Sequence, residues 1–133
     1  MEPALSLDTT FLIDLQKERR RKERGAAFGI LESHPQALLC CSVVAWGEFL
    51  EGLEGGAQHP LALAMRVHIQ LLPITEEVAE VYAVQTRSLR AAGWLPGTND
   101  LWIAATALEQ EQPLVTRNGR DFKRVPDLRV MTY

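Results

Sequence analysis

ALSLDTTFLIDL, the stretch at residues 4–15, changes from a strand pattern to a helix pattern at one acidic residue. Ala4 to Asp8 is a short apolar run, which predicts a buried strand. The apolar residues beyond it recur at the spacing of one helix face, at Phe11, Leu12 and Leu15. Asp8 therefore stands at the point where a strand ends and a helix begins.

The rest of the chain repeats this alternation. We expect further helices at residues 16–32, 42–52, 60–70, 75–93 and 99–111, and further strands at residues 37–43, 71–74, 114–116 and 128–131. Pro73 indicates that its strand lies at an edge or ends there, because proline donates no ladder hydrogen bond. Strands that alternate with helices pair in parallel. The sequence thus predicts an α/β three-layer sandwich, with a central parallel sheet of four to five strands flanked by helices.

The length of 133 residues suits a single domain, residues 1–133, that can bury a core without a disulfide or a structural metal. The formal net charge of −3 argues against a general polyanion binder, which is usually basic. No apolar run is long enough to cross a membrane, and the N-terminus lacks a signal-peptide pattern. Cys40 and Cys41 are neighbours in a predicted strand, so we expect two buried thiols facing opposite ways. A cytoplasmic location is the expectation from these features.

Four acidic residues stand beside apolar segments where a strand should end or a helix begin: Asp8, Glu48, Asp100 and Asp121. In a parallel α/β sheet these positions converge on one edge. Carboxylates are rarely buried without a partner, because removing a charge from water is costly. Hard oxygen ligands favour Mg²⁺ or Mn²⁺ over zinc. The pattern therefore predicts a shared divalent cation.

Each of these acidic residues also has a purely structural interpretation. Asp8 could cap the helix that follows it, and Asp100 could complement the dipole of its helix. Glu48 could be a solvated helix residue, and Asp121 could simply occupy a turn. Asp14 lies about two helical turns from Asp8, and we expect it at the surface.

Four segments, taken together, resemble the motifs of a known family. They are Leu5–Asp14 (LSLDTTFLID), Ser42–Glu48 (SVVAWGE), Asn99–Ala107 (NDLWIAATA) and Leu114–Phe122 (LVTRNGRDF). In this order and spacing they look like the motifs of a PIN domain and, more narrowly, of the VapC-type toxins of bacterial and archaeal toxin–antitoxin pairs. The resemblance spans nearly the whole chain.

The resemblance implies a metal-dependent endoribonuclease that acts as the toxin of a type II toxin–antitoxin pair. Asp8, Glu48 and Asp100 match the acidic ligand positions of the family. The fourth position is left open between Asp121, Asn118 as a neutral oxygen donor, and neither. The family also implies an RNA substrate, a cognate antitoxin and a homodimer.

Further residues receive roles around this site, two of them from the same resemblance and four from their position in the sequence. Thr9 and Thr116 match hydroxyl-bearing positions, which would position water or a phosphate oxygen. Four basic residues close to the proposed site in sequence are candidates for binding RNA phosphates: Arg117, Arg120, Lys123 and Arg124. Two alternatives stay open, namely an RNA-processing nuclease that has no antitoxin and a non-catalytic module that binds RNA or protein.

Overall fold

A computed structural model describes residues 3–133. The described residues form one parallel sheet of five strands: β1 (Ala4–Leu7), β2 (Leu38–Ser42), β3 (Ile69–Leu72), β4 (Leu114–Val115) and β5 (Val130–Met131). The strands lie in the order β3-β2-β1-β4-β5, and every neighbouring pair is parallel. The predicted fold class is confirmed.

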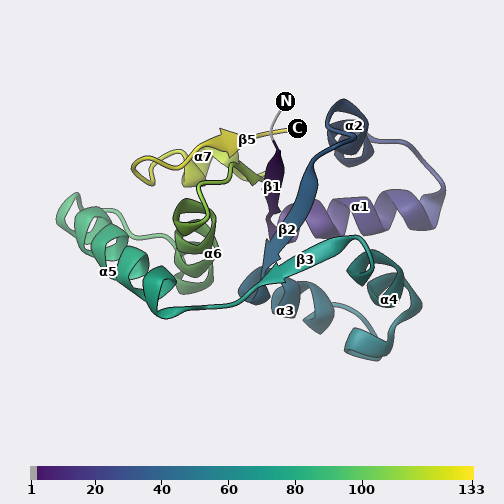
Figure 1. Ribbon diagram of the computed structural model, residues 1–133, viewed down its shortest axis with the longest axis horizontal. Coiled ribbons are helices and arrows are strands. Elements are labelled where there is room, and N and C mark those ends of the chain that lie inside the picture. Colours follow the sequence, from purple (N-terminus) through teal and green to yellow (C-terminus); the bar gives the residue numbers. More distant parts are fainter. Residues whose placement is uncertain (1–2) are drawn as a thin grey trace.

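Helices connect these strands and flank the sheet on both sides (Figure 1). Their bounds are α1 (Thr9–Arg21), α2 (Ala26–Ser33), α3 (Val43–Glu51), α4 (Pro60–Arg66), α5 (Glu76–Ala91), α6 (Thr98–Glu109) and α7 (Gly119–Phe122), with a 3-10 turn η1 (Gly56–Gln58) before α4. In the figure, α1, α2 and α4 lie to the right of the sheet, while α5 and α6 form a hairpin to its left. No helix in the described chain has the length and apolar character needed to span a bilayer.

The strand order places a topological switch point between β1 and β4. The chain moves outward from β1 through β2 to β3 and then returns to the other side of β1 with β4. Loops on the two sides of such a point run in opposite directions, which leaves a crevice at the carboxyl ends of the strands. Asp8 follows β1 and Thr116 follows β4, so both lie at this crevice.

Some predicted boundaries were wrong. One helix was expected over residues 16–32, but α1 continues to Arg21 and α2 begins anew at Ala26. Lys22 adopts a left-handed conformation with φ 55° and ends α1. The helix expected over 60–70 ends at Arg66, and the strand expected at 71–74 lies at Ile69–Leu72. Pro73 follows this edge strand, as predicted from its missing donor.

The core lies between the sheet and the helices. Leu5 and Leu7 of β1 are almost fully buried, as are Phe11 and Leu12 of α1. Cys40 and Cys41 are both buried and free, which confirms the expectation for them. Burial raises the pKa of both thiols, to about 12 for Cys41, so neither is a reactive thiolate near neutral pH.

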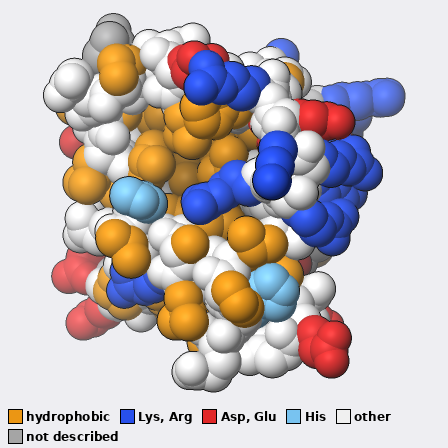
Figure 2. All heavy atoms as spheres, turned by 90° about the vertical axis from the view of Figure 1, so that its right-hand side faces the viewer, with side chains coloured by type: hydrophobic (Ala, Val, Ile, Leu, Met, Phe, Trp, Pro, Cys, Tyr) orange, Lys and Arg blue, Asp and Glu red, His pale blue; other side chains and the backbone are white. Residues whose placement is uncertain are grey.

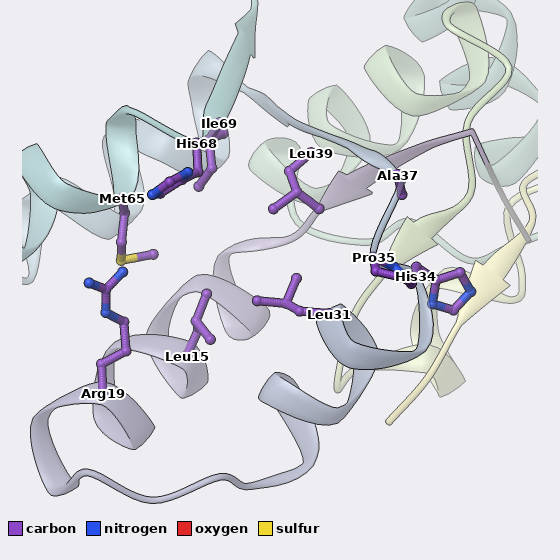
Figure 3. A pocket seen from close by; sticks show the side chains of 10 residues that line it. All are labelled: Leu15, Arg19, Leu31, His34, Pro35, Ala37, Leu39, Met65, His68 and Ile69. Carbon is purple, nitrogen blue, oxygen red and sulfur yellow. The ribbon is translucent and has the colours of Figure 1, made fainter.

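A hollow with apolar walls opens on the side of the molecule formed by α1, α2 and α4. Figure 2 shows apolar side chains gathered on this face, with basic side chains beside them. The hollow has a volume of about 240 Å³. Leu15, Leu31, Leu39 and Met65 contribute apolar walls, and Arg19 extends across one end (Figure 3). We call it the α1–α4 groove.

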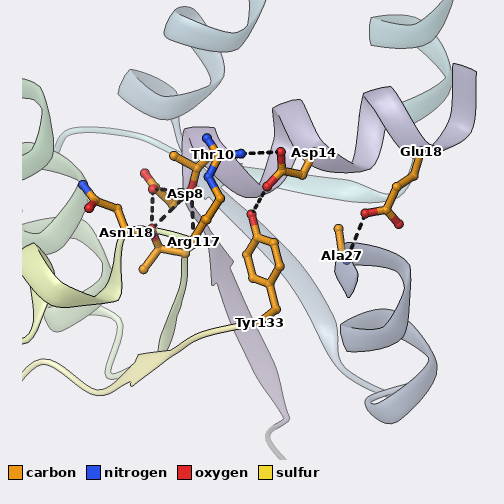
Figure 4. Close-up of polar contacts among 9 residues, drawn as sticks. Asp8, Thr10, Asp14, Glu18, Ala27, Arg117, Asn118 and Tyr133 are labelled. Carbon is orange, nitrogen blue, oxygen red and sulfur yellow. Dashed lines mark hydrogen bonds and ion pairs between the residues drawn. The ribbon is translucent and has the colours of Figure 1, made fainter. Parts of the chain in front are cut away.

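Glu18 joins α1 to α2. Its carboxylate accepts hydrogen bonds from the backbone N–H groups of Gly25, Ala27 and Phe28 at 2.8, 3.0 and 2.9 Å. Figure 4 shows the contact with Ala27. These groups belong to the first turn of α2, whose N–H groups have no partner within the helix and whose dipole favours a negative charge. The carboxylate leaves no room beside Gly25, where an added Cβ would lie 2.6 Å from the Glu18 carboxyl carbon.

Replacing Glu18 by alanine should therefore lower the free energy of unfolding by roughly 2–3 kcal/mol, because several charge-assisted hydrogen bonds are lost together. Urea unfolding measures this change. Glu23, an exposed acidic neighbour, provides the matched control, since its replacement by alanine should change stability by less than about 0.5 kcal/mol. Equal losses in the two variants would contradict the capping role.

Candidate active site

Asp8 is a buried carboxylate at the end of β1, with only 3% of its surface exposed. Its Oδ2 atom accepts hydrogen bonds from Thr116 Oγ1 at 2.7 Å and from Thr10 Oγ1 at 3.0 Å (Figure 4). Asp8 occupies the N-cap position of α1, yet its side chain makes no capping hydrogen bond. The carboxylate is therefore held by two hydroxyl groups, one from the first turn of α1 and one from the segment after β4, rather than by backbone N–H groups of α1.

The segment after β4 folds around Asp8. Thr116, which is fully buried, donates to Asp8 and accepts a hydrogen bond from the backbone N–H of Asn118 at 2.9 Å. The backbone N–H of Arg117 donates to Thr10 Oγ1 at 3.1 Å. Thr10 thus links α1, this segment and the Asp8 carboxylate. Sequence reasoning singled out Thr9 and Thr116 but missed Thr10.

Glu48 reaches the same edge of the sheet from α3. Its Oε1 atom accepts a hydrogen bond from Thr9 Oγ1 at 2.7 Å, and its Oε2 atom accepts one from Asn99 Nδ2 at 3.2 Å. The two donors come from the starts of α1 and α6, so Glu48 bridges elements that are distant in sequence. These contacts distinguish Glu48 from a freely solvated helix residue. Asn99 lies in the first turn of α6, whose N-cap is Gly97.

Asp100 lies in the first turn of α6. Partial burial, followed by the negative charges of Asp8, Glu48 and Asp121, raises its pKa from 3.8 to about 6. Four carboxylates from different parts of the chain therefore share one electrostatic environment. Glu48 and Asp100 also line an open hollow of about 400 Å³ together with Gly97, Thr98 and Asn99.

The fourth acidic residue is less enclosed. Asp121 is exposed in the first turn of α7, and its link to the cluster is its effect on Asp100. Asn118 is partly buried beside Thr116. The fourth position of the site stays open between these residues.

The donor chemistry of the cluster suits a hard divalent cation. Its oxygens are those that Mg²⁺ and Mn²⁺ prefer, and mutual repulsion among carboxylates is what a cation would relieve. Within residues 3–133, however, no group of three or more His, Cys, Asp or Glu side chains is arranged to hold an ion as it stands. Both carboxylate oxygens of Glu48 are already engaged in hydrogen bonds.

The four basic candidates are all exposed. Two of them have identified contacts. Arg124 stacks over the Trp94 ring, with its guanidinium carbon 4.9 Å from the ring centroid. Arg117 forms an ion pair with Asp14 at 2.7 Å. The expectation of a surface position for Asp14 was wrong, because its side chain is only 16% exposed.

Comparison with known proteins connects this arrangement to a family. The family profile described as PIN domain matches residues 5–128. The chain belongs to the PIN-domain family. This PIN domain is 27% identical over 132 residues to Ribonuclease VapC1 of Methanocaldococcus jannaschii, in an alignment that covers 99% of this chain and 88% of the relative.

Solved structures agree with this assignment. The structure of VapBC-1 from nontypeable Haemophilus influenzae superposes on this PIN domain with a TM-score of 0.78 at 27% identity, covering 97% of each chain. VapBC2 from Rickettsia felis, solved bound to a DNA fragment from its promoter, gives a TM-score of 0.81 at 21% identity and covers 97% of this chain and 98% of that chain. At 21% identity, the likeness to the Rickettsia felis structure supports the fold alone.

Proposed function

We propose that this PIN domain is a divalent-metal-dependent endoribonuclease and the toxin of a type II toxin–antitoxin pair. The observation that carries the proposal is the carboxylate cluster at the switch point, where the charges of Asp8, Glu48 and Asp121 contribute to raising the pKa of Asp100. A cluster of like charges is costly without a cation, which argues for a function that uses it. The VapC ribonuclease named above provides the substrate class.

In this proposal Asp8 and Asp100 hold Mg²⁺ or Mn²⁺ directly. The fourth position, Asp121 or Asn118, completes the donor set or supports a second ion. When bound, the cation supplies activation of water and neutralisation of charge on the attacked phosphate. Thr116 and Thr10 keep the Asp8 carboxylate in one orientation by donating to Oδ2. Because both hydroxyls use the same oxygen, Oδ1 takes part in neither bond.

Glu48 is the residue best placed to handle a proton. Its Oε1 is held by Thr9 and its Oε2 by Asn99, an exposed residue at the rim of the hollow. Release of the Asn99 contact would free Oε2 to accept a proton from attacking water. Hydrolysis would then form a bond from the water oxygen to phosphorus and break the phosphodiester P–O bond, and the proton taken up by Glu48 would end on the leaving oxygen.

Cleavage of total RNA by the purified wild-type protein tests the activity, with Mg²⁺ and with EDTA. We expect fragments only with the divalent cation. A well-folded protein that binds RNA without cutting it would favour the non-catalytic module. Cleavage that persists in EDTA would contradict the metal-dependent mechanism.

The α1–α4 groove supports the second part of the proposal, an antitoxin partner. A toxin–antitoxin complex from Klebsiella pneumoniae contains a chain that superposes on this PIN domain with a TM-score of 0.69 at 25% identity. We propose that an apolar helix of the antitoxin, carrying acidic residues beside its apolar stripe, occupies this groove. The apolar walls fit such a helix face, and Arg19 at one end provides the complementary charge (Figure 3).

Replacing Arg19 by glutamate should weaken binding of the antitoxin encoded with this chain by about tenfold or more, because like charges would then meet. Arg20, an exposed neighbour outside the lining of the groove, gives the control variant Arg20→Glu. Calorimetric titration of both variants measures the difference. Equal affinities for the two variants would place the partner elsewhere.

The remaining expected roles stay predictions. Arg120, Lys123 and Arg124 are exposed near the cluster in sequence and are proposed to contact RNA phosphates. Their replacement would then reduce the salt dependence of RNA binding. The homodimer implied by the family is testable by analytical ultracentrifugation. An active ribonuclease with no antitoxin partner would favour the RNA-processing alternative.

A further inference from the structure

Asp14 is a largely buried carboxylate with a partner on each oxygen. Its Oδ1 atom accepts a hydrogen bond from Arg117 Nη1 at 2.7 Å, and its Oδ2 atom accepts one from the Tyr133 hydroxyl at 2.6 Å (Figure 4). Burial, together with this carboxylate, raises the pKa of Tyr133, which therefore stays a hydroxyl donor. The Tyr133 ring packs edge-on against Phe11 of α1, with ring centroids 5.3 Å apart.

The Arg117 side chain is thereby stretched along α1. Its backbone N–H contacts Thr10 and its guanidinium contacts Asp14, and these residues are four positions apart on one helix face. Thr10 itself donates to Asp8. Asp14, which holds the guanidinium, therefore lies one helical turn from Thr10, with Cβ atoms roughly 5–6 Å apart, and Thr10 contacts the acidic cluster.

Stability alone is a weak reason for this arrangement. The Arg117 side chain is 56% exposed, while that of Asp14 is 16% exposed. An ion pair with such an exposed partner contributes little, about 0–1 kcal/mol, whereas removing a carboxylate from water is costly. The Tyr133 hydrogen bond already satisfies one carboxylate oxygen. The contact with Asp14 fixes the position of the positively charged Arg117 guanidinium, while the Arg117 side chain stays exposed to solvent.

We propose that Asp14 is a positioning residue, which holds the Arg117 guanidinium at the rim of the acidic cluster as a clamp for an RNA phosphate. An arginine suits this role because its planar fork binds phosphate oxygens in pairs and is pre-organised when one N–H is already held. Asp14 uses Nη1, and more than half of the Arg117 side chain remains exposed to solvent. The inference rests on the proposed ribonuclease function and adds a specific phosphate contact to it.

Five variants separate positioning from structure: Asp14→Ala, Asp14→Asn, Arg117→Ala, the double variant Asp14→Ala with Arg117→Ala, and Tyr133→Phe as the matched control. Tyr133→Phe removes the other hydrogen bond of the same carboxylate but leaves Arg117 in place. Steady-state cleavage of a short single-stranded RNA gives KM and kcat for each. The affinity of each variant for the same RNA is measured in EDTA by fluorescence anisotropy over a range of salt concentrations. This binding measurement does not depend on cleavage.

Arg117→Ala should raise KM about fivefold to tenfold with kcat within about twofold, and should reduce the slope of log affinity against log salt by about 0.7, the value for one phosphate on a single strand. Asp14→Ala should raise KM about threefold. The double variant should match Arg117→Ala, because positioning has no further effect once the guanidinium is absent. Asp14→Asn, which keeps an oxygen acceptor, should recover part of the loss. Tyr133→Phe should retain the wild-type KM.

Additive effects in the double variant, or a KM rise in Tyr133→Phe equal to that of Asp14→Ala, would overturn the positioning role. If the wild type cleaves RNA and Arg117→Ala binds RNA as tightly as the wild type does, the positioning role would also be overturned. The proposed ribonuclease function would remain intact in that case. A wild type that neither binds nor cleaves RNA would reject both. Thermal unfolding of each variant identifies any loss that comes from unfolding.

Discussion

Replacing Asp8 by asparagine should abolish RNA cleavage, with a loss on the order of 10²-fold or more, while the protein stays folded. Asparagine has nearly the same shape, and its amide oxygen can still accept hydrogen bonds from Thr10 and Thr116. The variant lacks the negative charge that Asp8 would contribute to cation binding in the proposed function. Removing one group that stabilises the reacting charges typically costs about 10²–10³-fold.

Cleavage of RNA under Mg²⁺, together with circular dichroism of the same sample, measures this prediction. Asp127→Asn is the matched control, since Asp127 is exposed and has a positive φ of 66°, which asparagine tolerates well. That control should cleave like wild type. Undiminished cleavage by folded Asp8→Asn would mean that another site, or a contaminating nuclease, carries the activity.

Replacing Asp100 by asparagine should have two opposite effects: loss of cleavage, and higher stability of the metal-free protein. The pKa of Asp100 is raised to about 6 in the folded state, from 3.8. The folded protein therefore holds this proton more tightly than the unfolded chain does. The contribution of Asp100 to the free energy of unfolding is greatest below about pH 4, where the residue is protonated. This contribution falls as the pH rises to about 6 and levels off above that pH.

Near neutral pH, the ionised Asp100 thus destabilises the metal-free fold. Because the side chain is only partly buried, we discount the full linkage energy for solvent screening, which leaves about 1–2 kcal/mol. Asp100→Asn removes this penalty. It should raise the free energy of unfolding by that amount at about pH 7.5 and have little effect below about pH 4.

Urea unfolding in EDTA at several pH values tests the sign of the effect. Added Mg²⁺ should then stabilise the wild type, because a ligand that binds only the folded state raises its stability, and should stabilise Asp100→Asn much less. Asp121→Asn is the comparison variant, since this exposed residue makes the smallest contribution to the Asp100 shift. A metal-free Asp100→Asn protein that is less stable than wild type at neutral pH would contradict the repulsion argument.

The local pattern of the sequence predicted the sheet and the position of the acidic residues in it. Apolar runs that alternate with amphipathic segments impose parallel strands, and the carboxyl ends of such strands meet at one edge. Asp8 could be placed there because it directly follows its strand, and Asp100 because it begins a helix. Glu48 was placed by its position in an early turn of an otherwise apolar helix. The resemblance then associated these positions with RNA chemistry.

Helix boundaries were harder to predict when a distant contact decided them. The prediction of one helix over residues 16–32 joined α1 to α2, although Gly25 and the basic residues before it are a possible stop signal. The separation depends on Glu18, which turns back to bind the first N–H groups of α2. Such a contact requires the chain to have folded back already, so periodicity within either helix contains no trace of it.

The contacts of Asp14, beside the candidate site, were also beyond what the local sequence pattern could predict. By itself the sequence determined which strands form, that they are parallel, and which carboxylates reach their ends, because these follow from local spacing and from burial of apolar faces. Tertiary structure alone decided that Arg117 and Tyr133, more than one hundred positions along the chain, meet Asp14 on α1. Hydrogen-bond partners at such separations are set by the strand order that brings β4 and β5 beside β1, and a local pattern contains no information about that order.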